Sequence, residues 1–475
     1  MGNKALEYFE NLKGKKISLI GLGVSHRPLV DLLLNYGASL TVCDKKNYED
    51  LKELIDKYQG KDINFSLGDD YLKNLGGDII FKGPGIRCDK PEILAAKEKG
   101  SIITSEMEVF FSLCPCRIIA VTGSEGKTTT TTLISKFLEA QGFTCHLGGN
   151  IGKPLLPEVL NINPDDFAVV ELSSFQLHTM EQSPYIAAIT NVTPNHLDWH
   201  TSMDEYVQSK QNIFKYQRVG ASRLTLNADN ITTFSFAKEA KGEVNFFSMK
   251  TRVVGTYMDS AGDIYHSDGS ADVNDDKFIM NKSNILLVGD HHIENYMTAI
   301  SATWGLVDIS NIIKIANTFG GVEHRTEFVR EYEGVKFYND AIATTPTRTI
   351  ACLKSQPKKI ILIVGGYDKK IPYGPLGPYI NDNVCCLICM GTTGPKIEEA
   401  VKEAENYDEK ALNILHVDNL EDAVLLAYKN ANSGESVYLS PASASFDLYS
   451  NFEAKGNHFK EIVNSLELLL QKEKD

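Results

Sequence analysis

The chain has 475 residues, of which 43% are hydrophobic and 23% charged, as in an ordinary water-soluble protein. This length exceeds what one hydrophobic core usually organises, so we expect roughly two to four domains. The formal net charge of −14 excludes a general attraction for nucleic acid or anionic membranes, and no apolar run approaches membrane-spanning length. Without a signal-peptide core at the N-terminus, the sequence predicts a cytoplasmic protein.

The nine cysteines are an odd number scattered along the chain. Cys385, Cys386 and Cys389 lie in one apolar run, and Cys114 and Cys116 flank Pro115. A zinc site would need a second Cys/His pair at ligand spacing. We therefore expect reduced thiols, mostly buried in strands, in a reducing compartment.

Residues 1–113 predict one α/β unit. A buried strand leads into the glycine turn 21–26 and a helix, and the next strand ends in Asp44, about twenty residues past the glycines as in dinucleotide-binding folds. However, His26 stands where that fingerprint has its third glycine, which favours a general nucleotide-phosphate turn over a nicotinamide site. A second tight turn, 82–86, follows the strand 78–81, where doubly wound sheets bind ligands.

The next unit, 114–320, begins with the strand 118–121, a glycine loop and a segment with helical spacing of apolar residues. Strand, glycine loop and helix form a phosphate cradle: loop N–H groups face an anion, Lys127 adds charge and the Thr128 hydroxyl can hold Mg²⁺. Val121 stands where the usual pattern has another glycine, so this is the shorter form of the loop. We expect a nucleoside triphosphate site.

Further along this unit, a strand delivers Glu171 at its end, where a hard cation needs an anionic oxygen. His196, Asp198 and His200 could look like a metal cluster, but only His196 is a functional candidate on residue types alone. Lys210 follows on a predicted helix and would by default be a solvated surface residue. The polar segment 240–285 resembles an insertion with short strands, and a helix begins near residue 289.

From about residue 321 a third α/β unit is expected. Its predicted strands end in Asp340, in glycines followed by Lys369, and in the hydroxyl-rich segment 440–445. Such strand ends indicate a ligand site at the carboxyl edge of a doubly wound sheet.

Taken together, these motifs resemble the Mur ligases, which form amide bonds in peptidoglycan precursor synthesis, and the resemblance covers essentially the whole chain. The shared segments are 123–129, 149–152, 171–176, 191–198 and His324-Arg325. The segments 365–369, 439–447 and 451–456 are most similar to the branch that adds D-glutamate to UDP-N-acetylmuramoyl-L-alanine.

This resemblance implies an α/β fold of three domains: a Rossmann-like UDP-binding domain (1–113), a central P-loop ATPase domain (114–320) and a Rossmann-like C-terminal domain that binds the amino acid (321–475). It implies ATP-dependent, ADP-forming ligation through an acyl phosphate, with Mg²⁺ as cofactor. The partners would be UDP-N-acetylmuramoyl-L-alanine and D-glutamate, and we expect a monomer.

The resemblance also assigns residues. The catalytic set is Lys127, Glu171, His196 and Lys210. The metal ligands are Thr128, Glu171, His196 and Lys210, the last as a carbamate, because a free ammonium would repel Mg²⁺. ATP would be held by Gly123, Ser124, Glu125, Gly126, Lys127, Thr128, Thr129, Asn150, Asn295, Arg325 and Asp340. The UDP-substrate would contact Leu22, Gly23, Val24, Ser25, Asp44, Ser173 and Gln176. D-Glutamate would contact Thr344, Lys369, Ser445 and Phe452.

Two residues depart from the family pattern: Ile342 replaces a common lysine, and His292 replaces a common adenine-contacting asparagine. The alternatives are a sister ligase with another acceptor, a folylpolyglutamate-type synthetase, a non-catalytic nucleotide-binding regulator and, last, a Rossmann dehydrogenase. The C-terminal motifs argue against the other ligases, and Lys127, Glu171 and Lys210 argue for catalysis.

Overall fold

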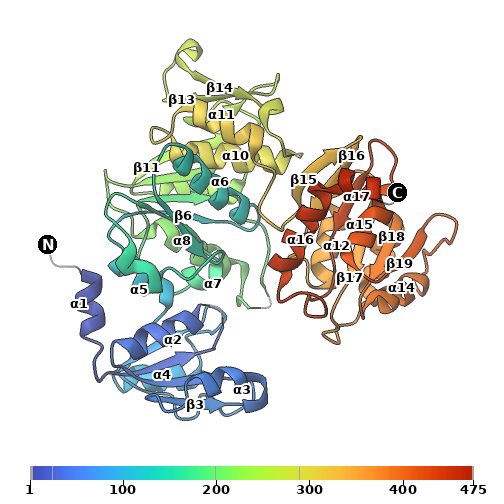
Figure 1. Ribbon diagram of the computed structural model, residues 1–475. Coiled ribbons are helices and arrows are strands. Elements are labelled where there is room, and N and C mark those ends of the chain that lie inside the picture. Colours follow the sequence, from blue (N-terminus) through green and yellow to red (C-terminus); the bar gives the residue numbers. More distant parts are fainter. Residues whose placement is uncertain (1–3, 24, 198, 288, 473–475) are drawn as a thin grey trace. The chain divides into compact units, whose positions relative to one another are not determined.

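The computed structural model describes residues 4–23, 25–197, 199–287 and 289–472. The chain forms two compact units, Met1–Thr318 and Phe319–Asp475. The first unit holds two β-sheets and the second holds one, each sheet combined with helices (Figure 1). The α/β class expected from the sequence is confirmed.

The first sheet has five parallel strands in the order β3-β2-β1-β4-β5. Its strands are β1 (Lys16–Ile20), β2 (Ser39–Asp44), β3 (Ile63–Leu67), β4 (Ile79–Lys82) and β5 (Ile102–Thr104). Its helices are α1 (Lys4–Glu10), α2 (His26–Asn35), α3 (Tyr48–Lys57), α4 (Pro91–Glu98) and α5 (Glu106–Leu113). The strand order reverses beside β1, so the turns after β1 and β4 flank the point where such sheets bind ligands.

The second sheet has nine strands in the order β14-β13-β12-β11-β10-β9-β6-β8-β7. They are β6 (Arg117–Thr122), β7 (Cys145–Gly149), β8 (Phe167–Glu171), β9 (Ile186–Ile189), β10 (Arg223–Asn227), β11 (Glu243–Ser248), β12 (Gly255–Met258), β13 (Asp263–Ser267) and β14 (Lys277–Asn281). Pairing is parallel from β7 across to β12, whereas β13 and β14 are antiparallel. The polar segment 240–285 therefore forms one edge of this sheet.

Helices and short turns connect these nine strands. The α-helices are α6 (Lys127–Ala140), α7 (Ser174–Leu177), α8 (Met203–Lys215), α9 (Ile231–Ser235), α10 (Asp290–Thr303) and α11 (Ile309–Thr318). The 3₁₀ turns are η1 (Leu156–Asn161), η2 (Phe236–Lys238), η3 (Val273–Asp275) and η4 (Lys282–Asn284). The apolar positions that predicted a helix after the glycine loop, Leu133, Ile134, Phe137 and Leu138, are all buried on α6.

The second unit has a six-stranded sheet in the order β15-β16-β20-β17-β18-β19, parallel except for β15. The strands are β15 (Glu327–Tyr332), β16 (Val335–Asn339), β17 (Ile360–Gly365), β18 (Val384–Met390), β19 (Asn413–Val417) and β20 (Ser436–Leu439). The helices are α12 (Pro346–Lys354), η5 (Gly374–Leu376), α13 (Gly377–Asn383), α14 (Gly394–Lys402), α15 (Leu420–Lys429), α16 (Phe452–Asn464) and α17 (Leu466–Lys472). One core joins the sheet to α15 and α16, and another joins it to α12, α13 and α14, so helices cover both faces.

The cysteines are all free thiols, and Cys386 and Cys389 are buried in β18 as expected, while Cys385 is half-buried there. Cys114 and Cys116, however, lie between α5 and β6 and not in a strand. Within the described residues, no helix combines the length and apolar character needed to cross a membrane. The same residues contain no cluster of three or more His, Cys, Asp or Glu side chains with metal-binding geometry.

Candidate active site

The glycine loop between β6 and α6 is a tight backbone turn that only glycine fits at two positions. Gly126 has φ 78° and caps α6, and a Cβ there would lie 2.2 Å from Asn295 Oδ1. A Cβ on Gly123, where φ is 154°, would lie 1.9 Å from Thr190 Oγ1. Lys127, Thr128 and Thr129 form the first turn of α6. Loop N–H groups and a helix N-terminus in this arrangement can cradle phosphate.

A hydroxyl, an amide and a carboxylate meet beside this loop. Thr128 Oγ1 donates a hydrogen bond to Glu171 Oε2 at 2.7 Å, and Asn150 Nδ2 donates to Glu171 Oε1 at 2.8 Å. Glu171 ends β8 and is 2% exposed, and Asn150 directly follows β7. Hydroxyl and carboxylate oxygens are ligands that Mg²⁺ accepts, so this donor set fits the metal implied by the sequence motifs.

Lys210 lies in the interior, so the default expectation of a solvated surface residue is wrong. It is 1% exposed, and its Nζ donates to the Gly123 carbonyl oxygen at 2.7 Å. Tyr206, Ile213 and Phe214 are buried on the same helix, and residue 210 falls on that face because helical neighbours are three or four positions apart.

The environment of Lys210 disfavours its charged form. Burial is the largest cause that lowers the pKa of Lys210 well below the ordinary lysine value, and the positive charge of Lys127 lowers it further. The Glu171 carboxylate opposes this shift. Lys127, Glu171 and Lys210 therefore act on one another electrostatically, and a neutral Lys210 amine is a nucleophile toward carbon dioxide.

The histidine-rich turn after β9 divides into an exposed and a buried part. His196 is exposed, has φ 54°, and its ring centroid lies 4.9 Å from that of Phe175. His200 is 2% exposed and its Nε2 lies 2.9 Å from Ser174 Oγ, while burial lowers its pKa to about 4. His200 is thus a core residue, and Asp198 lies outside the described residues.

The residues expected around adenine and ribose divide between the two units. Asn295, on α10, lies beside Gly126, and its Oδ1 accepts a hydrogen bond from Thr130 Oγ1 at 3.3 Å. Arg325 and Asp340 belong to the second unit. Asp340 accepts hydrogen bonds from Ser440 Oγ at 2.7 Å and Thr326 N at 3.2 Å, and burial raises its pKa to about 6.

The residues expected to bind the UDP-substrate already form contacts of their own. The Leu22 N–H donates to Asp44 Oδ2 at 2.6 Å, which ties the glycine turn to the end of β2. Gly23 lies in that turn and Ser25 precedes α2, whereas Val24 lies outside the described residues. Ser173 and Gln176 form a capping box at α7. These contacts organise the local backbone without a ligand.

The residues expected to hold D-glutamate follow strands of the second unit that end at one edge of the sheet. Thr344 comes after β16, Lys369 after β17, and Ser445 after β20, and these three strands are parallel neighbours. Lys369 is exposed, while Ser445 is buried and its hydroxyl has no hydrogen-bond partner among the described residues. Phe452 begins α16, and its ring centroid lies 5.9 Å from that of His324.

Several residues that support the glycine loop had no assigned role in the sequence. The Glu125 N–H donates to Asn191 Oδ1 at 3.0 Å, and Tyr206 OH lies 2.8 Å from Ser124 Oγ. Asn191 belongs to a recognised motif, but nothing in the spacing indicated Tyr206.

Two residues, Ile342 and His292, depart from the family pattern. The Ile342 N–H donates a hydrogen bond to the His324 carbonyl oxygen, and burial lowers the pKa of His292 to about 4.

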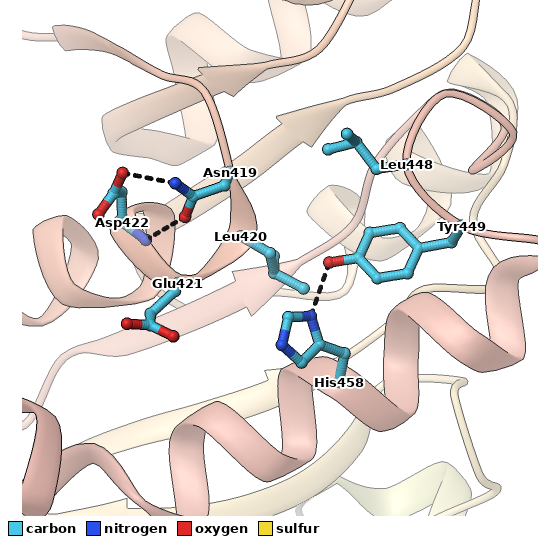
Figure 2. A pocket seen from close by; sticks show the side chains of 7 residues that line it. All are labelled: Asn419, Leu420, Glu421, Asp422, Leu448, Tyr449 and His458. Atoms are coloured by element: carbon cyan, nitrogen blue, oxygen red, sulfur yellow. Dashed lines mark hydrogen bonds between the residues drawn. The ribbon is translucent and has the colours of Figure 1, made fainter.

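The second unit also has a surface hollow of about 440 Å³, formed by the start of α15, the segment before α16, and α16 itself (Figure 2). Tyr449 OH points to His458 Nδ1 across it at 2.8 Å. Its lining residues are Asn419, Leu420, Glu421, Asp422, Leu448, Tyr449 and His458. None of the residues expected to bind D-glutamate lines it.

Comparisons with known proteins find the same family along most of the chain. Family models of the Mur ligase middle domain and of the Mur ligase glutamate ligase domain match residues 121–303 and 324–443. The UDP-N-acetylmuramoylalanine–D-glutamate ligase of Acetivibrio thermocellus is 52% identical, with 98% of this chain and 100% of the relative covered. The enzyme of that name from Clostridium beijerinckii is 47% identical, with 97% and 99% covered.

Solved structures share the fold at much lower identity. MurF from Acinetobacter baumannii matches with a TM-score of 0.54 and 14% identity, covering 97% of this chain and 98% of that one. The UDP-N-acetylmuramate–alanine ligase MurC from Thermotoga maritima matches with a TM-score of 0.52 and 17% identity, covering 95% and 99%. These likenesses concern the fold alone.

Proposed function

This chain belongs to the Mur ligase family, and we propose that it joins D-glutamate to UDP-N-acetylmuramoyl-L-alanine with conversion of ATP to ADP and phosphate. The observation that carries the proposal is the arrangement at the glycine loop. There Thr128 and Asn150 hold the Glu171 carboxylate, and the buried Lys210 contacts the loop backbone. The names of the relatives supply the substrates.

In the first half of the reaction, the terminal carboxylate of the muramoyl-L-alanine substrate attacks the γ-phosphorus of ATP and forms an acyl phosphate. Phosphoryl transfer needs positioning and neutralisation of charge more than covalent help from the protein. Lys127 and the N–H groups of residues 123–129 would hold the phosphates, with Asn150 near the γ-phosphate. Asn295, Arg325 and Asp340 would hold adenine and ribose.

Thr128, Glu171, His196 and a carbamylated Lys210 would hold Mg²⁺, which neutralises phosphate charge when bound. Carbamylation requires the neutral amine, and burial together with Lys127 favours that form of Lys210 by lowering its pKa. Carbon dioxide would add to the neutral Nζ with loss of one proton, which gives a carbamate whose anionic oxygen could serve as a ligand in place of an ammonium that would repel Mg²⁺.

In the second half, the amine of D-glutamate attacks the acyl carbon, and the tetrahedral intermediate expels phosphate. Lys369 would pair with a carboxylate of D-glutamate, Ser445 and Thr344 would donate hydrogen bonds, and Phe452 would frame the ligand. Leu22 to Ser25 and Asp44 would bind UDP, and Ser173 and Gln176 would hold the muramoyl-peptide.

We further propose domain limits of 1–113, 114–320 and 321–475, a monomeric state and a cytoplasmic location. The three sheets support three domains, although residues 1–318 form one compact unit.

The test is phosphate release from ATP by the full chain with UDP-N-acetylmuramoyl-L-alanine, Mg²⁺ and a panel of D- and L-amino acids. We expect turnover with D-glutamate alone and none from a Lys127→Ala variant. Turnover with another amino acid would keep the ligase and discard the roles of Lys369 and Ser445. Absence of turnover from folded protein would reject the proposal in favour of a binding function.

A further inference from the structure

Two cysteine thiols lie in contact where α5 leads into β6. Cys114 directly follows α5, Cys116 directly precedes β6, and their Sγ atoms are 3.5 Å apart. Cys114 is half-buried at the border of the core of the first unit, and Cys116 is buried in that core. None of the residues proposed for ligation belongs to this pair.

The intervening proline explains why the thiols meet. A residue before proline is restricted to extended conformations, and Cys114 has φ −58° and ψ 123°. In an extended chain, residues two apart point to the same side and the residue between them points away. Pro115 is accordingly exposed, while both thiols face inward. The Cys-Pro-Cys segment thus holds the two sulfurs together, and its restricted backbone would lose little conformational freedom if they bonded.

The two thiols are chemically unequal. The hydrogen bond with Cys116 is the main cause that lowers the pKa of the Cys114 thiol, and the same bond, with burial, raises the pKa of Cys116. Cys114 is also the more exposed of the two. A partly accessible thiol with a lowered pKa can attack disulfides as the thiolate, and a neighbouring protonated thiol can resolve the product.

A structural zinc site fits this pair poorly. Such a site needs four ligands, usually Cys and His. In the described part of the chain, these two thiols have no further His, Cys, Asp or Glu that would complete a cluster of three metal ligands. Two thiols without other ligands are suited to exchange chemistry.

We propose that Cys114 and Cys116 form a reversible thiol–disulfide exchange site that reacts with low-molecular-weight disulfides. The Cys114 thiolate attacks one sulfur of the small disulfide, forms a mixed disulfide and releases one small thiolate. The Cys116 thiol then loses its proton and attacks Cys114 Sγ, which forms the Cys114–Cys116 disulfide and releases the second thiolate. The two protein sulfurs together lose two electrons, and the small disulfide gains them.

Closing the ring requires the two sulfurs to move toward each other. The sulfurs must approach from 3.5 Å to about 2.05 Å, and the backbone around Pro115 connects the first sheet to β6, the strand that carries the glycine loop. The site therefore lies at the junction that precedes the glycine loop, and its exchange chemistry does not depend on the proposed ligase reaction.

The test exposes the reduced full chain to oxidised glutathione and maps its cysteines by mass spectrometry after digestion. In the wild type we expect the peptide with Cys114 and Cys116 to lose two hydrogens and retain no glutathione. Cys116→Ala should retain one glutathione on Cys114, because the resolving thiol is gone. Dithiothreitol should reverse both products.

Cys145 is the matched control within the same chain. It is half-buried like Cys114, but burial raises its pKa to about 12, so it should remain a thiol over the same interval. The proposal is overturned if Cys114 stays reduced, or if the wild type retains glutathione on Cys114 as stably as Cys116→Ala does. The wild-type result needs no variant to fold, and circular dichroism checks the folding of Cys116→Ala.

Discussion

Around the glycine loop of the central sheet, the candidate residues are already bonded to one another, whereas the carboxyl edge of the C-terminal sheet presents groups that await a partner. Thr128, Asn150 and Glu171 form one hydrogen-bonded set, and Lys210 is fixed to the loop backbone. At the other edge, Lys369 is exposed and the buried Ser445 hydroxyl has no partner among the described residues.

The difference fits the chemistry proposed for each edge. Transition-state charge is best stabilised by groups fixed in advance, because they need no reorganisation during the reaction. A site for a small amino acid instead gains affinity when the ligand satisfies groups that otherwise lack partners. The central edge would therefore respond to mutation mainly in kcat, and the C-terminal edge mainly in the KM for D-glutamate.

The largest effect is expected at Lys210. Lys210→Ala should lower kcat of D-glutamate-dependent phosphate release by about 10²- to 10³-fold, the usual result of removing a fixed electrostatic group. Bicarbonate should not restore activity, but a short carboxylic acid should restore part of it by replacing the carbamate oxygen. Lys215→Ala, on the exposed face of the same helix, is the control and should retain activity. Full activity in Lys210→Ala would remove the carbamate proposal.

Asp340 differs from the other candidate groups at the C-terminal edge, because its carboxylate is buried and already accepts hydrogen bonds. Its carboxyl titrates at about 6 in the folded state and at about 4 when unfolded, so the native state binds an extra proton between these values. Stability from this group is therefore present at low pH and falls as the pH rises through that window. Asp340→Asn removes this component, which amounts to up to about 3 kcal/mol.

Thermal unfolding of Asp340→Asn and wild type at several pH values measures this effect. The melting temperature of the variant relative to wild type should rise between about pH 4 and pH 6, because the native pKa of Asp340 lies above the unfolded value. Asp418→Asn, at an exposed position, is the control for the loss of a surface carboxylate. A constant difference for Asp340→Asn would contradict its raised pKa.

Lys369 tests whether the C-terminal edge binds the amino acid. Lys369→Met should raise the KM for D-glutamate by roughly ten- to a hundred-fold, since a hydrogen bond to a charged group contributes about 1.5–3 kcal/mol. The KM for ATP should change little. Lys370→Met, at the exposed neighbouring residue, provides the comparison. Equal effects of the two substitutions on the D-glutamate KM would argue against a direct contact.

The smallest effects are expected for substitutions of two buried serines, Ser443 and Ser445, which lie in the same loop but should differ in role. Ser445 lacks a hydrogen-bond partner among the described residues, whereas Ser443 Oγ lies 2.9 Å from Tyr373 OH and 2.7 Å from Thr393 Oγ1. Ser445→Ala should raise the D-glutamate KM several-fold without loss of stability. Ser443→Ala should instead lower the unfolding free energy by about 1 kcal/mol. Kinetics and urea unfolding of both variants would show any reversal of this pattern.

Local patterns of apolar residues and glycines predicted most of the strands and helices near both edges. The apolar run before Gly123 became β6, and the helical spacing after it became α6. These segments were predictable because their periodicity and glycine positions are local properties of the chain. The segment 240–285 was predicted to contain short strands, but its position as the edge of the nine-stranded sheet depends on pairing with a strand outside it, β10.

The sequence by itself determined the glycine loop and the strand ends that carry Glu171 and Asp340, because each follows from local backbone geometry. Only the tertiary structure decided that Lys210 is buried against Gly123 and that His200 is a core residue. It also decided that Ser445 lacks a partner while Ser443 has two. Burial and hydrogen bonding of this kind depend on residues far apart in the chain, which no local pattern can specify.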